Sequence, residues 1–248
     1  MTAEPFHPVC CTPLAEHCPL PTPVAGSAFA SCAFDPALLA PADFSRTGIH
    51  HPDNIQRSVA KRQAEFLAGR LCARHALARL GLPGHSLAIG EDRAPAWPTG
   101  MVGAITHGDG WAAAIAAPAS AQRGLGLDVE TVLEPARAAR LAGEILTSAE
   151  MERLPTDTGE AALAITLAFS LKESLFKALY PLVRQRFYFE AAEVLAWSGD
   201  GHARVRLLAD LGGGWTYGTE LPGQFCVQAG RLLSLVCIPA LHDERRFS

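Results

Sequence analysis

The chain carries the stretch AFSLKESLFKAL at Ala168 to Leu179. The apolar residues Ala161 to Leu167 run into it without a glycine or proline, so the two segments together predict one helix. Its charged residues are Lys172, Glu173 and Lys177. A helix that is apolar on most sides is expected to be buried, and buried charges need a partner, a ligand or a metal ion. These three charges therefore mark a candidate site.

The same residues also allow a purely structural interpretation. Ser170 and Glu173 fit the S-x-x-E pattern of a capping box, and Glu173 with Lys177 fits a surface ion pair. Two observations count against it. Of the 21 lysines and arginines, only Lys61, Lys172 and Lys177 are lysines, which suggests that an ammonium is specifically needed here. Ser170 would also lie inside the helix rather than at its start.

Composition limits the class of protein. The chain has 248 residues and a mass of 26.3 kDa, which allows one large domain or two small ones. A net charge of −4 argues against a general nucleic-acid binder. No membrane-spanning segment and no signal peptide is recognisable, so we expect a cytoplasmic protein. The seven cysteines lack the paired spacing of a zinc site and are expected to be free thiols.

A long basic helix is predicted in the first half of the chain. The segment Ile55 to Leu80 has helical periodicity and stops at Gly81 and Pro83. Arg62 and Arg70 lie about 80° apart around this helix, so both can flank one basic groove. A solvated basic face is the alternative.

A loop and a hairpin are predicted next. Two prolines indicate a loop after Arg93, and Met101 to Thr106 predicts a strand that ends at His107. Trp111 to Ala117 predicts its hairpin partner. Arg93, Thr106 and His107 are candidate phosphate donors. The alternative for His107 is a satisfied polar residue at a strand end.

An acidic strand is predicted at Gln122 to Glu130, QRGLGLDVE. Asp128 and Glu130 project from one face of it, and Leu127 and Val129 project from the other. Two carboxylates on one face repel each other unless a cation lies between them. Oxygen ligands without a nearby His or Cys favour Mg²⁺ or Mn²⁺ over zinc. A solvent-exposed strand end is the alternative, and a metal site would need a third carboxylate.

The remaining segments carry no predicted function. Met1 to Ala42 is expected to wrap the body of the protein as extended chain. Helices are predicted at Glu134 to Leu146 and at Thr147 to Leu154, the second beginning with a capping box. Antiparallel strands joined by glycine-rich turns are predicted at Phe187 to Trp197, Ala203 to Leu208 and Gln224 to Ile238.

Four blocks of the chain, in order, resemble the 4'-phosphopantetheinyl transferases of the surfactin/enterobactin type. They are KRxxEFLAGRLxAR at Lys61 to Arg74, RAPxWP and GAITH at Arg93 to His107, GLDVE at Gly126 to Glu130, and FSLKESLFKA at Phe169 to Ala178. Each block is short, but their order and spacing make the resemblance specific. The RxPxWP and LAGR motifs are most similar to the siderophore-synthetase branch, and the overall pattern is similar to pseudomonad members.

The sequence departs from the family pattern at two positions. Phe169 stands where the family often has Trp, and Thr106 stands where it often has Ser before the histidine. Both replacements keep the property needed, an aromatic ring and a hydroxyl. We therefore expect the activity to be retained.

The resemblance implies an α+β fold of two pseudo-symmetric halves. Each half would be a small antiparallel sheet packed on a long helix, with coenzyme A bound in the cleft between the halves. The sequence independently shows a helix followed by strands twice, in 55–117 and in 161–238. We place the N-terminal half at 1–121 and the C-terminal half, with the metal site and the signature helix, at 122–248. A monomer is expected because one chain already forms the cleft.

The implied reaction moves 4'-phosphopantetheine from coenzyme A to a serine of an acyl or peptidyl carrier protein and releases 3',5'-ADP. Such carriers serve fatty acid, nonribosomal peptide and siderophore synthesis. Asp128, Glu130 and Glu173 would hold Mg²⁺, or Mn²⁺, against the pyrophosphate. Glu173 would also accept the serine proton, and Lys177 would neutralise or protonate the leaving phosphate.

The resemblance also implies the contacts with coenzyme A. His107 and Thr106 match the family's 3'-phosphate contact, and arginines would add charge-assisted bonds. Lys172 would contact the β-phosphate region or the carrier. The predicted contacts are Arg62, Arg70, Arg93, Thr106, His107, Asp128, Lys172 and Lys177.

The carrier surface is predicted from charge. Carrier proteins are typically acidic, so basic residues beside apolar ones are the candidates. They are Arg137, Arg140, Arg184, Arg186, Phe187 and Phe189.

Two alternative functions use the same residues. One is another Mg²⁺-dependent phosphoryl or nucleotidyl transfer enzyme, although the GxxxxGK[ST] loop of the common NTPases is missing. The other is a non-catalytic sensor of coenzyme A or a nucleotide, which would need no base at Glu173. Release of 3',5'-ADP distinguishes the three cases.

Overall fold

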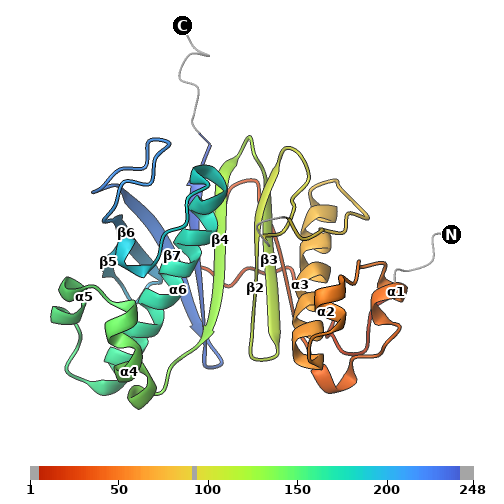
Figure 1. The fold of residues 1–248 in the computed structure, drawn as a ribbon, viewed down its shortest axis with the longest axis horizontal. Helices are drawn as coiled ribbons and strands as arrows, with labels where there is room; N and C mark the ends of the chain where they lie inside the picture. The colour runs from red at the N-terminus through yellow and green to blue at the C-terminus, as the bar shows by residue number, and fades with distance from the viewer. Residues whose placement is uncertain (1–5, 91–93, 241–248) are drawn as a thin grey trace, which may run out of the picture.

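The computed structural model describes residues 6–90 and 94–240. Two antiparallel sheets lie side by side, with strand orders β1-β3-β2 and β4-β8-β7-β6-β5 (Figure 1). Helix α3 (Ala60–Arg79) packs on the smaller sheet and helix α6 (Thr158–Val183) packs on the larger one. The prediction of an α+β fold with one sheet and one long helix in each half is confirmed.

The N-terminal half is built around a β-hairpin that carries Thr106 and His107. Strands β2 (Met101–Gly108) and β3 (Trp111–Pro118) form the predicted hairpin, and β1 (Ala28–Ala33) pairs with the other edge of β3. Buried alanines on β3 and leucines on α3 form the core between sheet and helix. Three short helices precede α3: η1 (Pro36–Leu38), α1 (Asp43–Thr47) and α2 (Asp53–Gln56).

The helix predicted over Ile55 to Leu80 is interrupted, so that expectation is wrong in its first turns. The chain leaves the α conformation between α2 and α3, where Val59 is extended with φ −64° and ψ 155°. The Ser58 hydroxyl donates to the carbonyl of Asn54, and the Gln63 side chain donates to the carbonyl of Ser58. Such side-chain to backbone bonds offer the backbone an alternative to a continuous helix.

The C-terminal half follows the predicted order of elements, except that the range predicted as a strand at Gln224 to Ile238 is a hairpin of two strands. Strand β4 (Gln122–Thr131) is followed by α4 (Pro135–Ile145), α5 (Ser148–Glu152) and α6, and the capping box of α5 is present. The sheet is completed by β5 (Ala192–Trp197), β6 (His202–Leu207), β7 (Glu220–Gln228) and β8 (Arg231–Pro239). The strand predicted from Phe187 begins only at Ala192, because the 3₁₀ turn η2 (Phe189–Ala191) precedes it.

Helix α6 is the central helix of this half. Asp157 caps its first turn, accepting hydrogen bonds from the backbone N–H groups of Gly159 and Glu160. Ser170 lies in the middle of the helix, so the capping-box interpretation of Ser170 and Glu173 is excluded. Close packing against β4 depends on glycine, because a Cβ atom at Gly126 would collide with backbone atoms of α6. The absence of a side chain there brings the α6 residues directly over the acidic end of β4.

The two halves meet where β2 faces β4 (Figure 1). The Thr106 hydroxyl accepts a hydrogen bond from the backbone N–H of Val129 at 2.9 Å and so joins the two strands. The N-terminal segment also crosses between the halves, since the backbone N–H of Thr22 donates to the Gln224 side chain at 2.8 Å. This agrees with the expected wrapping segment, although part of that segment forms β1. The division at residues 121 and 122 stays a prediction.

Two expectations from composition can be compared with the described residues. All seven cysteines are free thiols, as predicted. Within residues 6–90 and 94–240, no helix is both long enough and apolar enough to span a bilayer.

Candidate active site

An acidic corner forms where β4 meets α6. The Lys177 ammonium donates to Asp128 Oδ1 at 2.7 Å and to the carbonyl of Leu127 at 3.0 Å. The Ser170 hydroxyl donates to Asp128 Oδ2 at 2.8 Å. Both oxygens of Asp128, which is 5% exposed, therefore have partners on one helix. The predicted proximity of the acidic strand and the signature helix is thus observed.

Glu130 and Glu173 complete this acidic corner. Burial and the negative charge of Asp128 together raise the pKa of Glu130 to about 7, against the opposing charge of Lys177. Burial also raises the pKa of Glu173, with Lys177 lowering it and Asp128 raising it. One ammonium therefore serves three carboxylates that lie within electrostatic reach of one another.

The chemistry of this donor set suits a hard divalent cation. Carboxylate oxygens are the ligands that Mg²⁺ and Mn²⁺ prefer. Within residues 6–90 and 94–240, however, no three His, Cys, Asp or Glu side chains are arranged closely enough to share one ion. Coordination by Asp128, Glu130 and Glu173 together would therefore require at least one of these side chains to rotate.

A basic hollow of about 420 Å³ lies beside α3, and Arg62, Arg70 and His107 line it. Arg62 Nη1 lies 2.8 Å from His107 Nε2. Burial lowers the pKa of His107, and the charges of Arg62 and Lys177 lower it further. Because a guanidinium can only donate, the neutral imidazole accepts at Nε2. The structure thus brings together three of the predicted phosphate ligands.

Glu65 is a member of this hollow that sequence analysis missed. Its carboxylate lies 3.3 Å from Arg62 Nη1 and 3.7 Å from His107 Nδ1. Arg62 and Glu65 are three residues apart on α3, a spacing that places both on one face of a helix. That spacing could have identified Glu65. In this structure Glu65 supplies the negative charge that balances Arg62.

Arg70 and Thr106, two predicted contacts of coenzyme A, are both buried and bonded within the protein. Arg70 is 6% exposed, lies 4.5 Å above the Phe66 ring and donates through Nε to the carbonyl of Leu87 at 3.0 Å. Burial lowers the pKa of Arg70 to about 10, and Arg62 adds to the shift. Thr106 is 3% exposed and serves the junction of the halves. Arg93, a further predicted ligand, lies outside the described residues.

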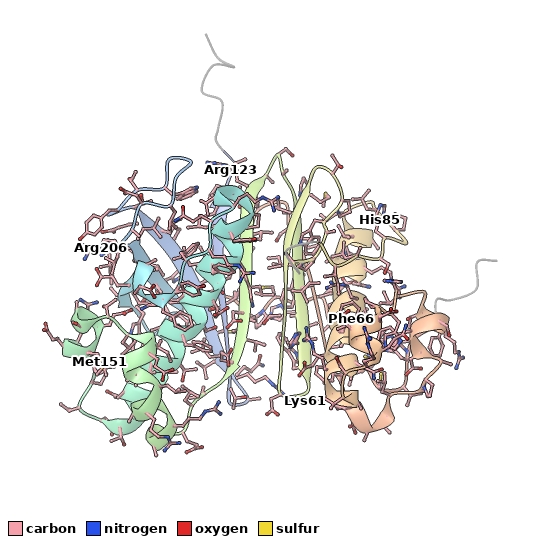
Figure 2. All side chains as sticks on the ribbon, viewed as in Figure 1. Lys61, Phe66, His85, Arg123, Met151 and Arg206 are labelled. Carbon is pink, nitrogen blue, oxygen red and sulfur yellow. The ribbon has the colours of Figure 1, made fainter. Side chains whose placement is uncertain are left out.

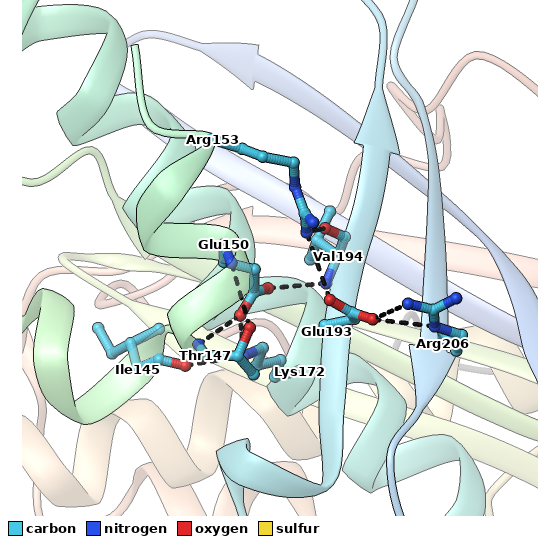
Figure 3. Close-up of polar contacts among 8 residues, drawn as sticks. All are labelled: Ile145, Thr147, Glu150, Arg153, Lys172, Glu193, Val194 and Arg206. Atoms are coloured by element: carbon cyan, nitrogen blue, oxygen red, sulfur yellow. Dashed lines mark hydrogen bonds and ion pairs between the residues drawn. The ribbon is translucent and has the colours of Figure 1, made fainter. Parts of the chain in front are cut away.

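The Lys172 ammonium is bonded within the C-terminal half rather than at the acidic corner. It donates to Glu150 at 2.7 Å and to the carbonyl of Ile145 at 2.8 Å (Figure 3). Glu150 in turn accepts from the backbone N–H of Val194 at 2.7 Å. Because successive residues differ by about 100° around a helix, Lys172 faces α4 and α5 while Glu173 faces the cleft. Lys172 also lines the same hollow as Glu173, and its contact with the β-phosphate region or the carrier stays a prediction.

Two further hollows adjoin the basic hollow in sequence and reach the acidic corner. The basic hollow shares Pro95 and Ile105 with a second hollow of about 390 Å³, which Lys177 lines. The second shares Phe176 and Arg186 with a third of about 200 Å³, which Glu173 lines. Side chains from both halves fill the space between the two sheets (Figure 2). We call these three hollows together the interhalf groove.

Comparison with known proteins identifies the family. Residues 50–117 match the 4'-phosphopantetheinyl transferase N-terminal domain, and residues 124–229 match the 4'-phosphopantetheinyl transferase superfamily. The chain is 39% identical to the 4'-phosphopantetheinyl transferase Npt of Nocardia iowensis over 175 residues, which is 68% of this chain and 73% of that protein. The chain belongs to the 4'-phosphopantetheinyl transferase superfamily.

Two further relatives support the assignment to this superfamily. Enterobactin synthase component D of Salmonella typhi is 38% identical over 168 residues, covering 66% of this chain and 67% of that protein. The 4'-phosphopantetheinyl transferase PptT of Mycobacterium tuberculosis is 32% identical over 192 residues, covering 74% and 82%. The family predicted from the four sequence blocks is confirmed, and the chain is an enzyme that transfers phosphopantetheine to carrier proteins.

The two matched regions of the 4'-phosphopantetheinyl transferase superfamily contain the two ends of the interhalf groove. The N-terminal match includes Arg62, Arg70 and His107, and the C-terminal match includes Glu173 and Lys177. The roles of the individual residues follow from their geometry rather than from the comparisons.

Proposed function

We propose that the chain uses coenzyme A as donor, Mg²⁺ as metal ion and the residues of the interhalf groove as its catalytic machinery. The observation that carries this proposal is that one groove joins a basic hollow to an acidic corner. Coenzyme A has two separate anionic groups, a 3'-phosphate and a pyrophosphate. The groove suits such a ligand because its basic end can bind one phosphate directly, and its acidic end can bind the other anionic group through a metal ion and Lys177.

The basic hollow is the proposed 3'-phosphate site. Arg62 and Arg70 supply positive charge there, and His107 supplies a polar ring held by Arg62. Guanidinium groups bind phosphate through short, charge-assisted hydrogen bonds. A dianionic phosphate entering the hollow would compete with Glu65 for Arg62. Arg93 stays a predicted further ligand, and Thr106 is proposed to position the adjacent His107 through its bond to β4.

The acidic corner is the proposed pyrophosphate and metal site. Mg²⁺ bound by Asp128, Glu130 and Glu173 would supply Lewis-acid stabilisation of the pyrophosphate, and Mn²⁺ is the alternative ion. Lys177 neutralises the leaving phosphate, and its present bond to Asp128 keeps its ammonium at the corner. The raised pKa values of Glu130 and Glu173 indicate that the metal-free site has too little positive charge for its carboxylates, which supports the binding of a cation there.

Glu173 is the proposed base for the carrier serine. The serine oxygen forms a bond to the phosphorus that carries pantetheine, the bond from that phosphorus to 3',5'-ADP breaks, and the serine proton passes to Glu173. A carboxylate with a raised pKa is a better proton acceptor near neutral pH. Burial beside Asp128 raises the pKa of Glu173, which supports this role.

The carrier is proposed to bind next to the third hollow. Arg184 and Arg186 are exposed at the end of α6, and Arg137 and Arg140 are exposed on α4. Tyr188 is 67% exposed beside them, whereas Phe187 is buried at 8%, so the exposed aromatic residue differs from the one expected. Acidic carriers would complement the arginines.

Siderophore synthesis is the proposed biological setting. One of the relatives given above is named enterobactin synthase component D, and the other two are named 4'-phosphopantetheinyl transferases. We therefore propose a peptidyl carrier of a siderophore synthetase as the preferred substrate, with acyl carriers of fatty acid synthesis as the alternative. The monomeric state and the cytoplasmic location stay predictions.

The test is the intact mass of purified apo carrier proteins after incubation with the chain, coenzyme A and Mg²⁺. One acyl carrier and one peptidyl carrier are run in parallel, with EDTA as the metal-free control. We expect a gain of one phosphopantetheine and an equal amount of 3',5'-ADP, both absent with EDTA. Bound coenzyme A without product would favour the sensor, and a nucleotide product other than 3',5'-ADP would favour a different phosphoryl transfer.

A further inference from the structure

Three buried serines stand behind the proposed metal ligand Asp128. Ser170 and Ser174 lie one turn apart on α6, and Ser234 lies on β8, directly opposite Asp128 in the β4–β8 pair. All three serines are 0% exposed. The Ser170 and Ser234 hydroxyl oxygens are 2.8 Å apart, as are those of Ser234 and Ser174.

Asp128 fixes the direction of these hydrogen bonds. An ionised carboxylate only accepts, so Ser170 must use its single hydroxyl proton on Asp128 Oδ2. Ser170 can then only accept from Ser234, and Ser234 donates its proton to Ser170. Ser174 has the Ser234 hydroxyl at 2.8 Å and the Ser234 carbonyl at 3.1 Å as acceptors. The hydrogen bonds thus run in one direction from Ser234 to Ser170 to the carboxylate, and the Ser174 proton goes to the hydroxyl or the carbonyl of Ser234.

The packing of α6 on β4 makes this arrangement rigid. Gly124 and Gly126 leave no room for a Cβ atom between the strand and the helix backbone. The serines therefore lie in a region without solvent, where a hydroxyl that loses its partner costs about 1–3 kcal/mol. Because no solvent reaches these serines, each hydroxyl is oriented only by its hydrogen bonds to the neighbouring serine or to Asp128.

We infer that Ser170 and Ser234 are positioning residues for Asp128. They anchor Oδ2 inside the protein, which leaves Oδ1 to Lys177, a residue that lines the interhalf groove. Oδ1 is then the oxygen presented to a metal ion. This inference rests on the proposed metal role of Asp128 and adds residues that do not themselves touch substrate or metal.

The test compares Ser170→Ala and Ser234→Ala with wild type by Mn²⁺ titration of the full chain, followed by electron paramagnetic resonance. Residues that orient a metal ligand typically change metal affinity by about 10- to 100-fold when removed. We expect Ser170→Ala to weaken Mn²⁺ binding about 10-fold or more. Ser234→Ala should have a smaller effect in the same direction, because Ser170 keeps the hydroxyl proton that it donates to Asp128.

Thr166→Ala is the matched control. Thr166 lies on α6 one turn before Ser170 and is also 0% exposed. Its hydroxyl donates to the carbonyl of Ala162. The control should lose stability by a similar amount, measured as Tm, without a change in Mn²⁺ affinity. If Ser170→Ala does not fold, Ser234→Ala carries the comparison.

The outcomes separate this inference from the proposed function. Wild-type Mn²⁺ affinity in both serine variants, in a protein that binds Mn²⁺ and transfers phosphopantetheine, would overturn the positioning role alone. Equal loss of affinity in Thr166→Ala would overturn it too, because the effect would then be general destabilisation. A wild-type protein that neither binds Mn²⁺ nor needs a divalent ion for transfer would instead remove the proposed metal site, and this inference with it.

Discussion

The Lys172 ammonium lies 2.7 Å from the Glu150 carboxylate, and the two side chains are 2% and 5% exposed. Glu150 also binds the backbone N–H of Thr147, so the pair fastens α6 to the start of α5. Breaking a buried pair by removing one partner leaves an uncompensated charge. This pair therefore contributes to the stability of the C-terminal half.

Lys172→Met should lower the free energy of unfolding by about 3–5 kcal/mol, because Glu150 would remain buried without its cation. The double variant Lys172→Met with Glu150→Gln should be destabilised less than Lys172→Met alone. Urea denaturation of both variants measures this. A Lys172→Met protein that is stable but has lost affinity for coenzyme A would instead support the predicted contact of Lys172 with coenzyme A.

Glu173→Ala should abolish transfer while coenzyme A binding remains measurable. Loss of a general base costs about 10²- to 10⁴-fold in rate, and loss of a metal ligand adds to it. Holo-carrier formation by mass spectrometry gives the rate, and isothermal titration gives the binding. Glu160→Ala, an exposed carboxylate in the first turn of the same helix, is the control. Near wild-type turnover in Glu173→Ala would remove Glu173 from the mechanism.

Arg62→Ala should weaken binding of coenzyme A but not of dephospho-coenzyme A, which lacks the 3'-phosphate. A hydrogen bond to a charged group contributes about 1.5–3 kcal/mol, so a loss of about 10- to 100-fold is expected. Isothermal titration with both ligands measures the difference. Arg79→Ala on the same helix, where the side chain pairs with Glu16, is the matched control. An equal loss for both ligands would place the 3'-phosphate elsewhere.

The raised pKa of Glu130 predicts how stability depends on pH in the metal-free protein. Its pKa is about 7 in the folded chain against 4.5 for the ordinary side chain, so the folded state binds more protons between these values. Stability should therefore fall as pH rises from about 4.5 to about 7. Urea titrations of wild type and Glu130→Gln across this range isolate the contribution. The slopes should differ, and identical slopes would contradict the shift.

Reversing the charge of Arg137, Arg140 and Arg184 together should raise the KM for an acidic carrier and leave the KM for coenzyme A unchanged, whereas Arg186 is kept because it lines the interhalf groove. Electrostatic complementarity acts mainly on association, so the effect should shrink at high salt. Steady-state kinetics at two salt concentrations provides the measurement. An unchanged KM for the carrier would place its binding surface elsewhere.

The sequence allowed the main elements of the site to be predicted because they follow local rules. The alternation of QRGLGLDVE predicted β4 and the shared face of Asp128 and Glu130, and the apolar run before Phe169 predicted α6. Neither rule says how the two elements approach each other. The contact between Lys177 and Asp128 was therefore not predicted, although both residues were.

Other features depend on tertiary structure and could not be predicted in the same way. The direction of the Lys172 side chain depends on the position of Glu150, which comes from a segment given no function. The break at Val59 depends on side-chain bonds that compete with the helix. Strand β1 lies in a segment rich in proline and alanine, and it is a strand because β3 offers it an edge.

The junction of β2 and β4 also has a consequence for the behaviour of fragments. Each of these strands lies at the edge of its own sheet, and an uncovered edge can pair with another chain. In the intact protein each half covers an edge of the other, joined by the bond from Val129 to Thr106. Either half produced alone would expose a long edge strand and would be prone to aggregate. The solubility of each half therefore depends on the other half, which covers its edge strand.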